Sequence, residues 1–199
     1  MTDIIDRLAG VRPGGSVDAL RRHRPVTRDN AQASYDALFT DIDEAHASFA
    51  ERAAVAQFVA ILHDDEVAAA HYGALTRSAG GDALADAVAD AAAASRTDGP
   101  YGEYPAEGPL AVESVTGLRL ELDDAERAAL GERLSTALEH AHLLVFRPRE
   151  SSAVALATLA DAGWSTDGIV TLSQLVSFLA FQLRVAAGLR LLSNEELAA

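Results

Sequence analysis

The chain contains no cysteine and no lysine. Without a thiol it cannot form a disulfide, a cysteine-based zinc site, an iron–sulfur cluster or a thiolate nucleophile. All sixteen of its basic residues are arginine, which excludes Schiff-base chemistry and a lysine general base. Acid–base catalysis by other side chains and metal binding are the chemistries left to consider.

Aromatic residues make up only 6% of the chain, strand-like alternation is scarce, and alanine is abundant. This composition favours helices over sheets, so we predict an all-α fold. A length of 199 residues suits a single domain with a substantial core. We expect a helical extension at residues 1–24 and the main helical domain at residues 25–199.

The formal net charge is −14, with a pI near 4.7. Such a chain repels phosphate backbones and anionic lipid surfaces, so we predict no nucleic-acid partner and no membrane partner. The start MTDIIDRLAG lacks the basic and apolar regions of a signal peptide. Residues 169–192 are apolar but include Arg184 and Arg190, which are costly in lipid. We expect a buried helix in a soluble, cytoplasmic protein.

Residues 49–76 form the stretch around which we expect the fold to be organised. Ser48 and Glu51 have the spacing of a capping box, which marks the start of a helix. From residue 53 to residue 62 only Gln57 is polar, and a helix that is apolar on every side must be buried on every side. The run stops at residues 63–66, His-Asp-Asp-Glu, and a second helix is predicted from about residue 66 to residue 78.

Other helices are expected from the spacing of apolar residues and from capping residues. They are predicted at residues 2–9, in a short segment from residue 16, at about 31–39, and at 82–95, 123–146, 151–162 and 167–192. Proline and glycine interrupt residues 96–121, which predicts an ordered surface loop, with a short strand at 112–120 as an alternative. Residues 51–75 and 167–191 share a plan, so a diverged internal duplication is a further hypothesis.

Two stretches carry a resemblance to a known family. One is AERAAVAQFVAILHDDEVAAAHY (50–72), and the other is RPRESSAVALATLADAGWSTDGIVTLSQLVSFLAFQLRVAAGL (147–189). They resemble the carboxymuconolactone decarboxylase/alkylhydroperoxidase D-like family, in particular its peroxidase-related branch. The chain also resembles a cysteine-free subgroup described only as "CMD domain protein". The resemblance implies an alkylhydroperoxidase D-like helical bundle that assembles into a homo-oligomer, as a dimer, trimer or hexamer.

The resemblance also implies a thiol peroxidase site, in which a glutamate and a histidine activate a Cys-x-x-Cys pair. Aligned without gaps, the two cysteine positions fall on Asp65 and Ala68, the glutamate on Ala53 and the histidine on Tyr72. A register shifted by two residues brings Glu51 to the glutamate position but still supplies no cysteine. Thiol peroxidase chemistry is therefore excluded in either register.

The candidates for the remaining chemistry surround the break between the two helices. They are Glu51, His63, Asp65, His71 and Tyr72. Either histidine could transfer protons near neutral pH, and a neighbouring carboxylate would orient it. The family's decarboxylases need no redox cysteine, so such chemistry is compatible with the resemblance. The surrounding acids would repel a carboxylated substrate.

The same residues also have a purely structural interpretation. Asp64 or Asp65 would cap the second helix, and His71 would pack in the core or at an interface. A shared metal is not expected, because His63 and His71 are about 12 Å apart along a continuous helix. We therefore predict no metal and no cofactor.

Three histidine and arginine positions elsewhere lead to further expectations. His140 and His142 should point to different helix faces, one at an interface and the other in solvent. Arg184 lies within an apolar helix and should need a buried partner, for which Glu51 or Asp65 is our hypothesis.

Two functions remain open from the sequence. The first is a small-molecule pocket at the 51–72 turn that only binds its ligand or performs non-redox acid–base chemistry on it. The second is a catalytically inactive structural or interaction subunit that partners a cysteine-bearing peroxidase-related homologue.

Overall fold

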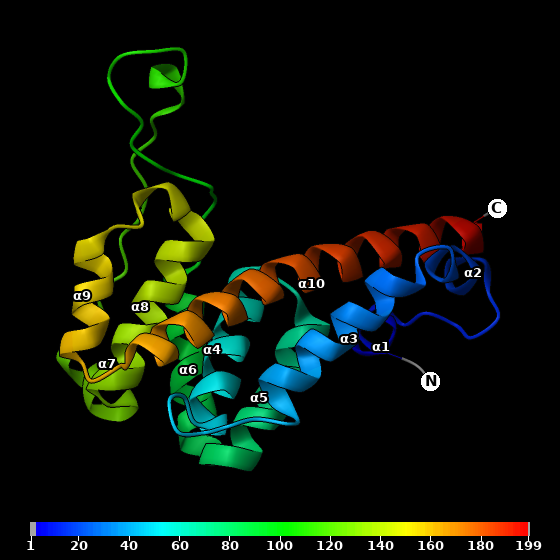
Figure 1. Cartoon of the computed structure of the whole chain (residues 1–199), viewed down its shortest axis with the longest axis horizontal. Coiled ribbons are helices and arrows are strands. Elements are labelled where there is room, and N and C mark those ends of the chain that lie inside the picture. Colours follow the sequence, from blue (N-terminus) through cyan, green and yellow to red (C-terminus); the bar gives the residue numbers. More distant parts are fainter. Residues whose placement is uncertain (1–2, 199) are drawn as a thin grey trace. The chain divides into compact units, whose positions relative to one another are not determined.

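The structure is a computed structural model that describes residues 3–198, with side chains described to residue 193. The regular elements in this range are helices and no strand occurs among them, which confirms the predicted all-α class (Figure 1). The chain divides into two compact units, Met1–Ile42 with Phe178–Ala199, and Asp43–Ser177.

The first unit contains three N-terminal helices and the C-terminal part of the last helix. These are α1 (Ile4–Ala9), α2 (Ser16–Arg22), α3 (Pro25–Phe39) and α10 (Thr166–Ala198). Both α1 and α2 pack against α3. The boundary expected at residue 24 lies within this unit, between α2 and α3.

Buried ion pairs join the three N-terminal helices. Asp3, Asp6 and Asp18 are at most 7% exposed. The Arg21 guanidinium lies 2.6 Å from the carboxylate of Asp3 and 2.9 Å from that of Asp6. The Arg28 guanidinium lies 2.8 Å and 2.5 Å from the same two carboxylates and 3.6 Å from Asp18. We call these five residues the N-terminal ion cluster. In this cluster the buried carboxylates are paired with guanidinium groups from other helices.

The second unit is built around α4. Its helices are α4 (Phe49–Leu62), α5 (Glu66–Gly80), α6 (Asp82–Ser95), α7 (Asp124–Leu130), α8 (Glu132–Phe146), α9 (Ala153–Asp161) and the N-terminal part of α10. Helix α4 packs against α5, α6 and α8, and residues 53–60 are at most 3% exposed (Figure 1). The predicted capping box of Ser48 and Glu51 is confirmed. The prediction that α4 is buried on every side is confirmed as well.

The prediction of a single helix over residues 123–146 is wrong. This stretch is interrupted at Gly131, whose φ is +79°, and divides into α7 and α8. A residue with a side chain rarely adopts this backbone conformation, whereas glycine does so readily. The apolar spacing continues across the break, which is why periodicity alone predicted one helix.

Residues 96–123 form the irregular segment that connects α6 to α7, as the sequence predicted (Figure 1). The alternative of a strand at 112–120 is wrong. The segment contains only a short 3₁₀ turn, Ala111–Glu113, and an isolated antiparallel bridge between Gly102 and Val115. A single bridge closes the segment on itself without forming a sheet.

Two further expectations are corrected by burial. Arg184 was expected to be buried, but its side chain is exposed and donates to its own helix at Ala180 O, 3.1 Å away. Its proposed partners are engaged elsewhere, since Glu51 pairs with Arg133 and Asp65 caps α5. His140 and His142 are both buried, at 5% and 0% exposure, so neither is solvated as expected.

Burial of the two histidines predicts a pH-dependent stability. Burial lowers the pKa of His140 and of His142 below the ordinary value of 6.5. The unfolded chain therefore binds more protons than the folded chain once the pH falls below about 6.5, and stability must decrease with falling pH. Each histidine contributes a slope of at most about 1.4 kcal/mol per pH unit.

A His140→Leu variant should flatten this slope, as measured by urea denaturation between about pH 7 and pH 5. The variant should remain folded, because His140 Nε2 is buried and has no hydrogen-bond partner among the described residues. Replacing the exposed His23 with leucine is the control and should leave the slope unchanged. An identical slope in wild type and His140→Leu would refute the assignment.

Helix α10 includes a stretch that meets length and composition criteria for a membrane span. Thr166–Ser193 is the one such helix found among the described residues, and 39% of its most apolar window is buried. Core helices of soluble proteins meet the same criteria, so this is weak evidence for a span. A soluble, cytoplasmic protein stays a prediction.

Candidate functional site

The structure separates the predicted site residues. Glu51 lies in the first turn of α4, whereas His63 is the residue at which that helix ends. Twelve residues of helix correspond to about 18 Å of rise, so the two side chains cannot act on one small molecule. Asp65 lies with His63 at the break between α4 and α5, whereas His71 and Tyr72 lie within α5, about 9 Å or more of helical rise beyond Asp65.

The break is organised by helix capping. Asp64 adopts a left-handed conformation with φ of +58°, and Asp65 follows as the N-cap of α5. The Asp65 carboxylate, 6% exposed, accepts a hydrogen bond of 3.0 Å from the Ala68 amide. The rings of His71 and Tyr72 lie 4.8 Å apart, and Tyr72 is fully buried. This arrangement matches the structural interpretation of the turn.

At the other end of α4, Glu51 takes part in a dense polar cluster. One carboxylate oxygen completes the capping box with Ser48, and the other accepts a 2.5 Å bond from Arg133 Nε. The Arg133 guanidinium also donates to Gly163 O and, over 2.8 Å, to His46 O. Its carbon lies 4.0 Å above the Trp164 ring. Arg133 therefore holds three separate segments of the second unit together.

His46 lies between a hydroxyl and a carboxylate. Its Nδ1 is 2.9 Å from Ser165 Oγ, and its Nε2 is 3.5 Å from an Asp167 carboxylate oxygen. Ser165 Oγ also accepts a 3.1 Å bond from the Gly168 amide, so it caps the start of α10. We call His46, Ser165 and Asp167 the His46 triad. Its side chains are accessible, with His46 at 42% and Asp167 at 76% exposure.

Backbone contacts fix the position of the His46 triad. A Cβ on Gly168 would lie 2.7 Å from His46 O, so only glycine lets the start of α10 approach the His46 loop this closely. Arg52 holds the same loop by donating to Ala47 O at 3.0 Å and to Asp43 O at 2.6 Å. The imidazole is therefore attached to a well-anchored segment even though it is exposed.

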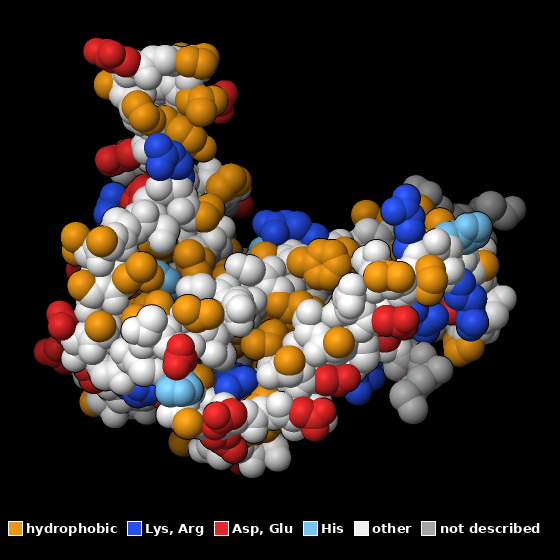
Figure 2. All heavy atoms as spheres, viewed as in Figure 1, with side chains coloured by type: hydrophobic (Ala, Val, Ile, Leu, Met, Phe, Trp, Pro, Cys, Tyr) orange, Lys and Arg blue, Asp and Glu red, His pale blue; other side chains and the backbone are white. Residues whose placement is uncertain are grey.

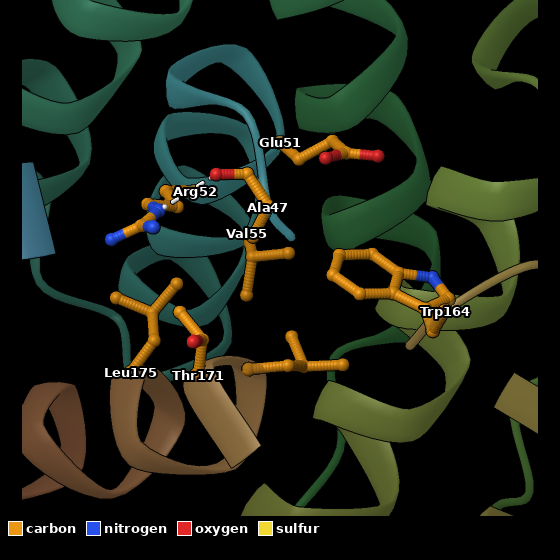
Figure 3. Close-up of a pocket in the computed structure, with 8 residues that line it drawn as sticks. Ala47, Glu51, Arg52, Val55, Trp164, Thr171 and Leu175 are labelled. Atoms are coloured by element: carbon orange, nitrogen blue, oxygen red, sulfur yellow. Dashed lines mark hydrogen bonds between the residues drawn. The ribbon is translucent and has the colours of Figure 1, made fainter. Parts of the chain in front are cut away.

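An apolar crevice lies next to the segments that carry the triad, and none of the three triad residues is part of its lining. Its lining includes Ala47 and Trp164, which are the chain neighbours of His46 and Ser165. Figure 3 shows the Trp164 indole on one side of the crevice, facing Val55. Thr171 and Leu175 of α10 lie on the side opposite the indole. The crevice is lined by Ala47, Glu51, Arg52, Val55, Trp164, Thr171, Leu172 and Leu175.

The enclosed volume of the crevice is about 10 Å³, which is room for about one water molecule. Drug-sized ligands occupy pockets of about 300–1,000 Å³, so a ring-sized molecule would enter this crevice only if the lining side chains moved apart. Glu51 is the one predicted site residue that lines it. Among residues 3–193, no group of three or more histidine and acidic side chains is arranged to hold a metal ion.

The sequence reasoning missed the His46 triad and Arg133. His46 and Ser165 are separated by 119 residues, and no spacing rule relates them. The one local signal is the Ser165-Thr166 pair before the helix predicted at 167–192, a residue type that caps helices but gives no indication of a histidine partner.

Comparison with known proteins adds no relatives to these observations. No family model matches the chain, and a search of curated proteins finds no match.

Proposed function

We propose that the chain is a redox-inactive member of the carboxymuconolactone decarboxylase/alkylhydroperoxidase-like group that performs acid–base chemistry on a small molecule. The site is the Glu51 end of the predicted 51–72 region, extended by the His46 triad. The observation that supports this most directly is His46, with Ser165 and Asp167 on its two ring nitrogens, on segments whose adjacent residues Ala47 and Trp164 line an apolar crevice.

The arrangement suits proton transfer by His46. When the ring proton is on Nε2, facing Asp167, Nδ1 is unprotonated and is the basic atom on the Ser165 side. When Nδ1 takes a proton from a substrate, the Asp167 carboxylate stabilises the imidazolium that forms. The absence of cysteine is consistent with non-redox chemistry of this kind.

The charges around the crevice favour a neutral substrate. Glu51 and Arg52 are the charged residues that line it; Glu51 is bonded by Arg133, and the Arg52 guanidinium donates to the Ala47 and Asp43 carbonyls. A substrate carboxylate would have to compete with these existing partners for either guanidinium. Small neutral ketones, lactones and esters avoid that competition.

Exchange of the α-hydrogens of cyclohexanone in D₂O, followed by NMR, tests this proposal. The protein should accelerate exchange because His46 removes an α-proton, and His46→Gln should lower the protein-catalysed rate about 100-fold. His71→Gln, within α5, is the matched control and should retain the rate. Equal rates in wild type and His46→Gln, or no acceleration at all, would contradict the proposal.

Peroxide consumption gives an independent check of the loss of redox function. Purified protein in the presence of a metal chelator should not consume hydrogen peroxide above the buffer rate. Consumption by the cysteine-free chain would overturn the claim that redox function has been lost from this scaffold.

A second candidate function is that of an interaction subunit, and the irregular segment favours it. Leu110, Val112, Val115 and Leu118 in this segment are 45–85% exposed. Figure 2 shows apolar side chains gathered on it. Under this alternative the chain would be catalytically inactive and would bind a cysteine-bearing homologue. The homo-oligomer expected from the resemblance, as a dimer, trimer or hexamer, is likewise a proposal.

A further inference from the structure

We infer that Ser165 is a nucleophile and that the His46 triad catalyses hydrolysis of small neutral esters and lactones. This inference rests on the proposed function, because it requires His46 to act as the base. It adds a covalent step and a substrate class to that function.

The capping role of Ser165 is compatible with a nucleophilic role. A hydroxyl has one hydrogen to donate and two lone pairs to accept hydrogen bonds. Ser165 Oγ can accept from the Gly168 amide at 3.1 Å and still donate its hydrogen to His46 Nδ1 at 2.9 Å. The Gly168 bond fixes the oxygen in place, and the imidazole is positioned to remove the proton.

The orientation of His46 completes the requirement for an activated serine. A serine hydroxyl is a weak nucleophile until an adjacent base takes its proton, and the base in turn needs a group that orients it. Asp167 supplies that group at 3.5 Å from Nε2. Such contacts are often long in the absence of substrate and shorten in the reacting complex.

The start of α10 favours the charge that develops during the reaction. Helix α10 begins at Thr166, directly after Ser165, so the amides of its first turn lie beside the nucleophile. The positive end of the helix dipole stabilises negative charge at this position. An ester carbonyl attacked by Ser165 would develop its oxyanion next to these amides.

The proposed reaction has two balanced steps. Ser165 Oγ forms a bond to the ester carbonyl carbon while its proton moves to His46 Nδ1. The C–O bond to the leaving group breaks, and His46 returns the proton to the departing alcohol. Water then attacks the acyl-serine with His46 as base, which releases the carboxylic acid and restores the serine hydroxyl.

The small size of the crevice favours a short acyl chain, because it requires the least movement of the lining side chains. Val55, Leu172, Leu175 and the Trp164 indole make its walls apolar. Glu51 lines it, and the Arg52 guanidinium is engaged by two backbone carbonyls, which disfavours an acidic substrate. An acetate ester satisfies both conditions, so p-nitrophenyl acetate is a suitable probe.

The test combines turnover of p-nitrophenyl acetate with trapping by an alkyl fluorophosphonate, followed by peptide mass spectrometry. The wild type should carry the adduct on Ser165. Ser165→Asn keeps an oxygen that can cap α10 but has no hydroxyl, and its turnover should fall at least about 100-fold. Ser152 caps α9 through the Ala155 amide, so Ser152→Ala is the matched control and should retain turnover.

The outcomes separate this inference from the proposed function. An adduct that is absent from Ser165, or turnover that survives in Ser165→Asn, overturns the inference. If His46-dependent exchange of cyclohexanone persists in that case, only the nucleophilic role fails. If the exchange is absent too, the proposed function fails with it. Circular dichroism of each variant confirms that a loss of turnover does not come from unfolding.

Discussion

Replacing Asp6 with alanine is expected to destabilise the folded chain by about 3–5 kcal/mol, the range measured when one partner of a buried ion pair is removed. Asp6 is 2% exposed and accepts from both Arg21 and Arg28, at 2.9 Å and 2.5 Å. Its loss leaves two guanidinium groups, 9% and 16% exposed, with reduced compensation. The free energy of unfolding from urea denaturation measures the effect.

The control for this prediction is Arg22→Ala. Arg22 pairs with Asp18 at 2.8 Å, but its side chain is 66% exposed. Exposed ion pairs contribute little to stability, so this variant should be close to wild type. If Asp6→Ala lowers the free energy of unfolding as little as Arg22→Ala does, the N-terminal ion cluster does not hold α1, α2 and α3 together as described.

Replacing Arg133 with methionine should have the second large effect, because it removes several contacts at once. Glu51 loses its 2.5 Å bond, and the carbonyls of His46 and Gly163 lose a charged donor. Hydrogen bonds to charged groups contribute about 1.5–3 kcal/mol each. Because Arg133 is 34% exposed, solvent screening reduces the total, and we expect about 2 kcal/mol.

The same variant should also abolish exchange of cyclohexanone, because Arg133 holds the loop that carries His46. Arg77→Met is the control, since Arg77 is 50% exposed and its pairs with Asp82 and Asp86 measure 3.4 Å. That control should retain both stability and exchange. An Arg133→Met protein with wild-type exchange would show that the His46 loop does not depend on the guanidinium.

The features that the sequence predicted correctly depend on local patterns. The capping box of Ser48 and Glu51 involves residues three positions apart, and both bonds form as expected. The burial of α4 follows from a run with a single polar residue, Gln57, whose amide donates to Ala85 O. Local propensity and the amount of apolar surface are sufficient to predict such elements.

The features that it did not predict depend on direction and tertiary contact. Arg184 was expected to be buried because its neighbours in sequence are apolar, yet its position on α10 faces solvent. Gly131 ended a helix through its backbone conformation, which apolar spacing does not reveal. A residue's average surroundings in the sequence do not indicate the side of the helix on which it lies.

The candidate site shows the same limit. Glu51 and His63 were grouped because both lie near one helix, but they lie at its opposite ends. The residues that do surround Glu51 come from the segments at 46, 133 and 164, which only the fold brings together. Predicting the His46 triad would have required the approach of α10 to the His46 loop that Gly168 permits.

Trp164 offers the most direct measurement of whether the crevice is a binding site. It is the single tryptophan of the chain and lies in the crevice wall, so its fluorescence reports on ligand entry without a label. Cyclohexanone should change Trp164 emission in a saturable manner in the wild type, and Thr171→Phe, which fills the crevice, should abolish saturation. A linear response in the wild type, equal to that of free N-acetyltryptophanamide, would contradict a ligand site at this end of α4.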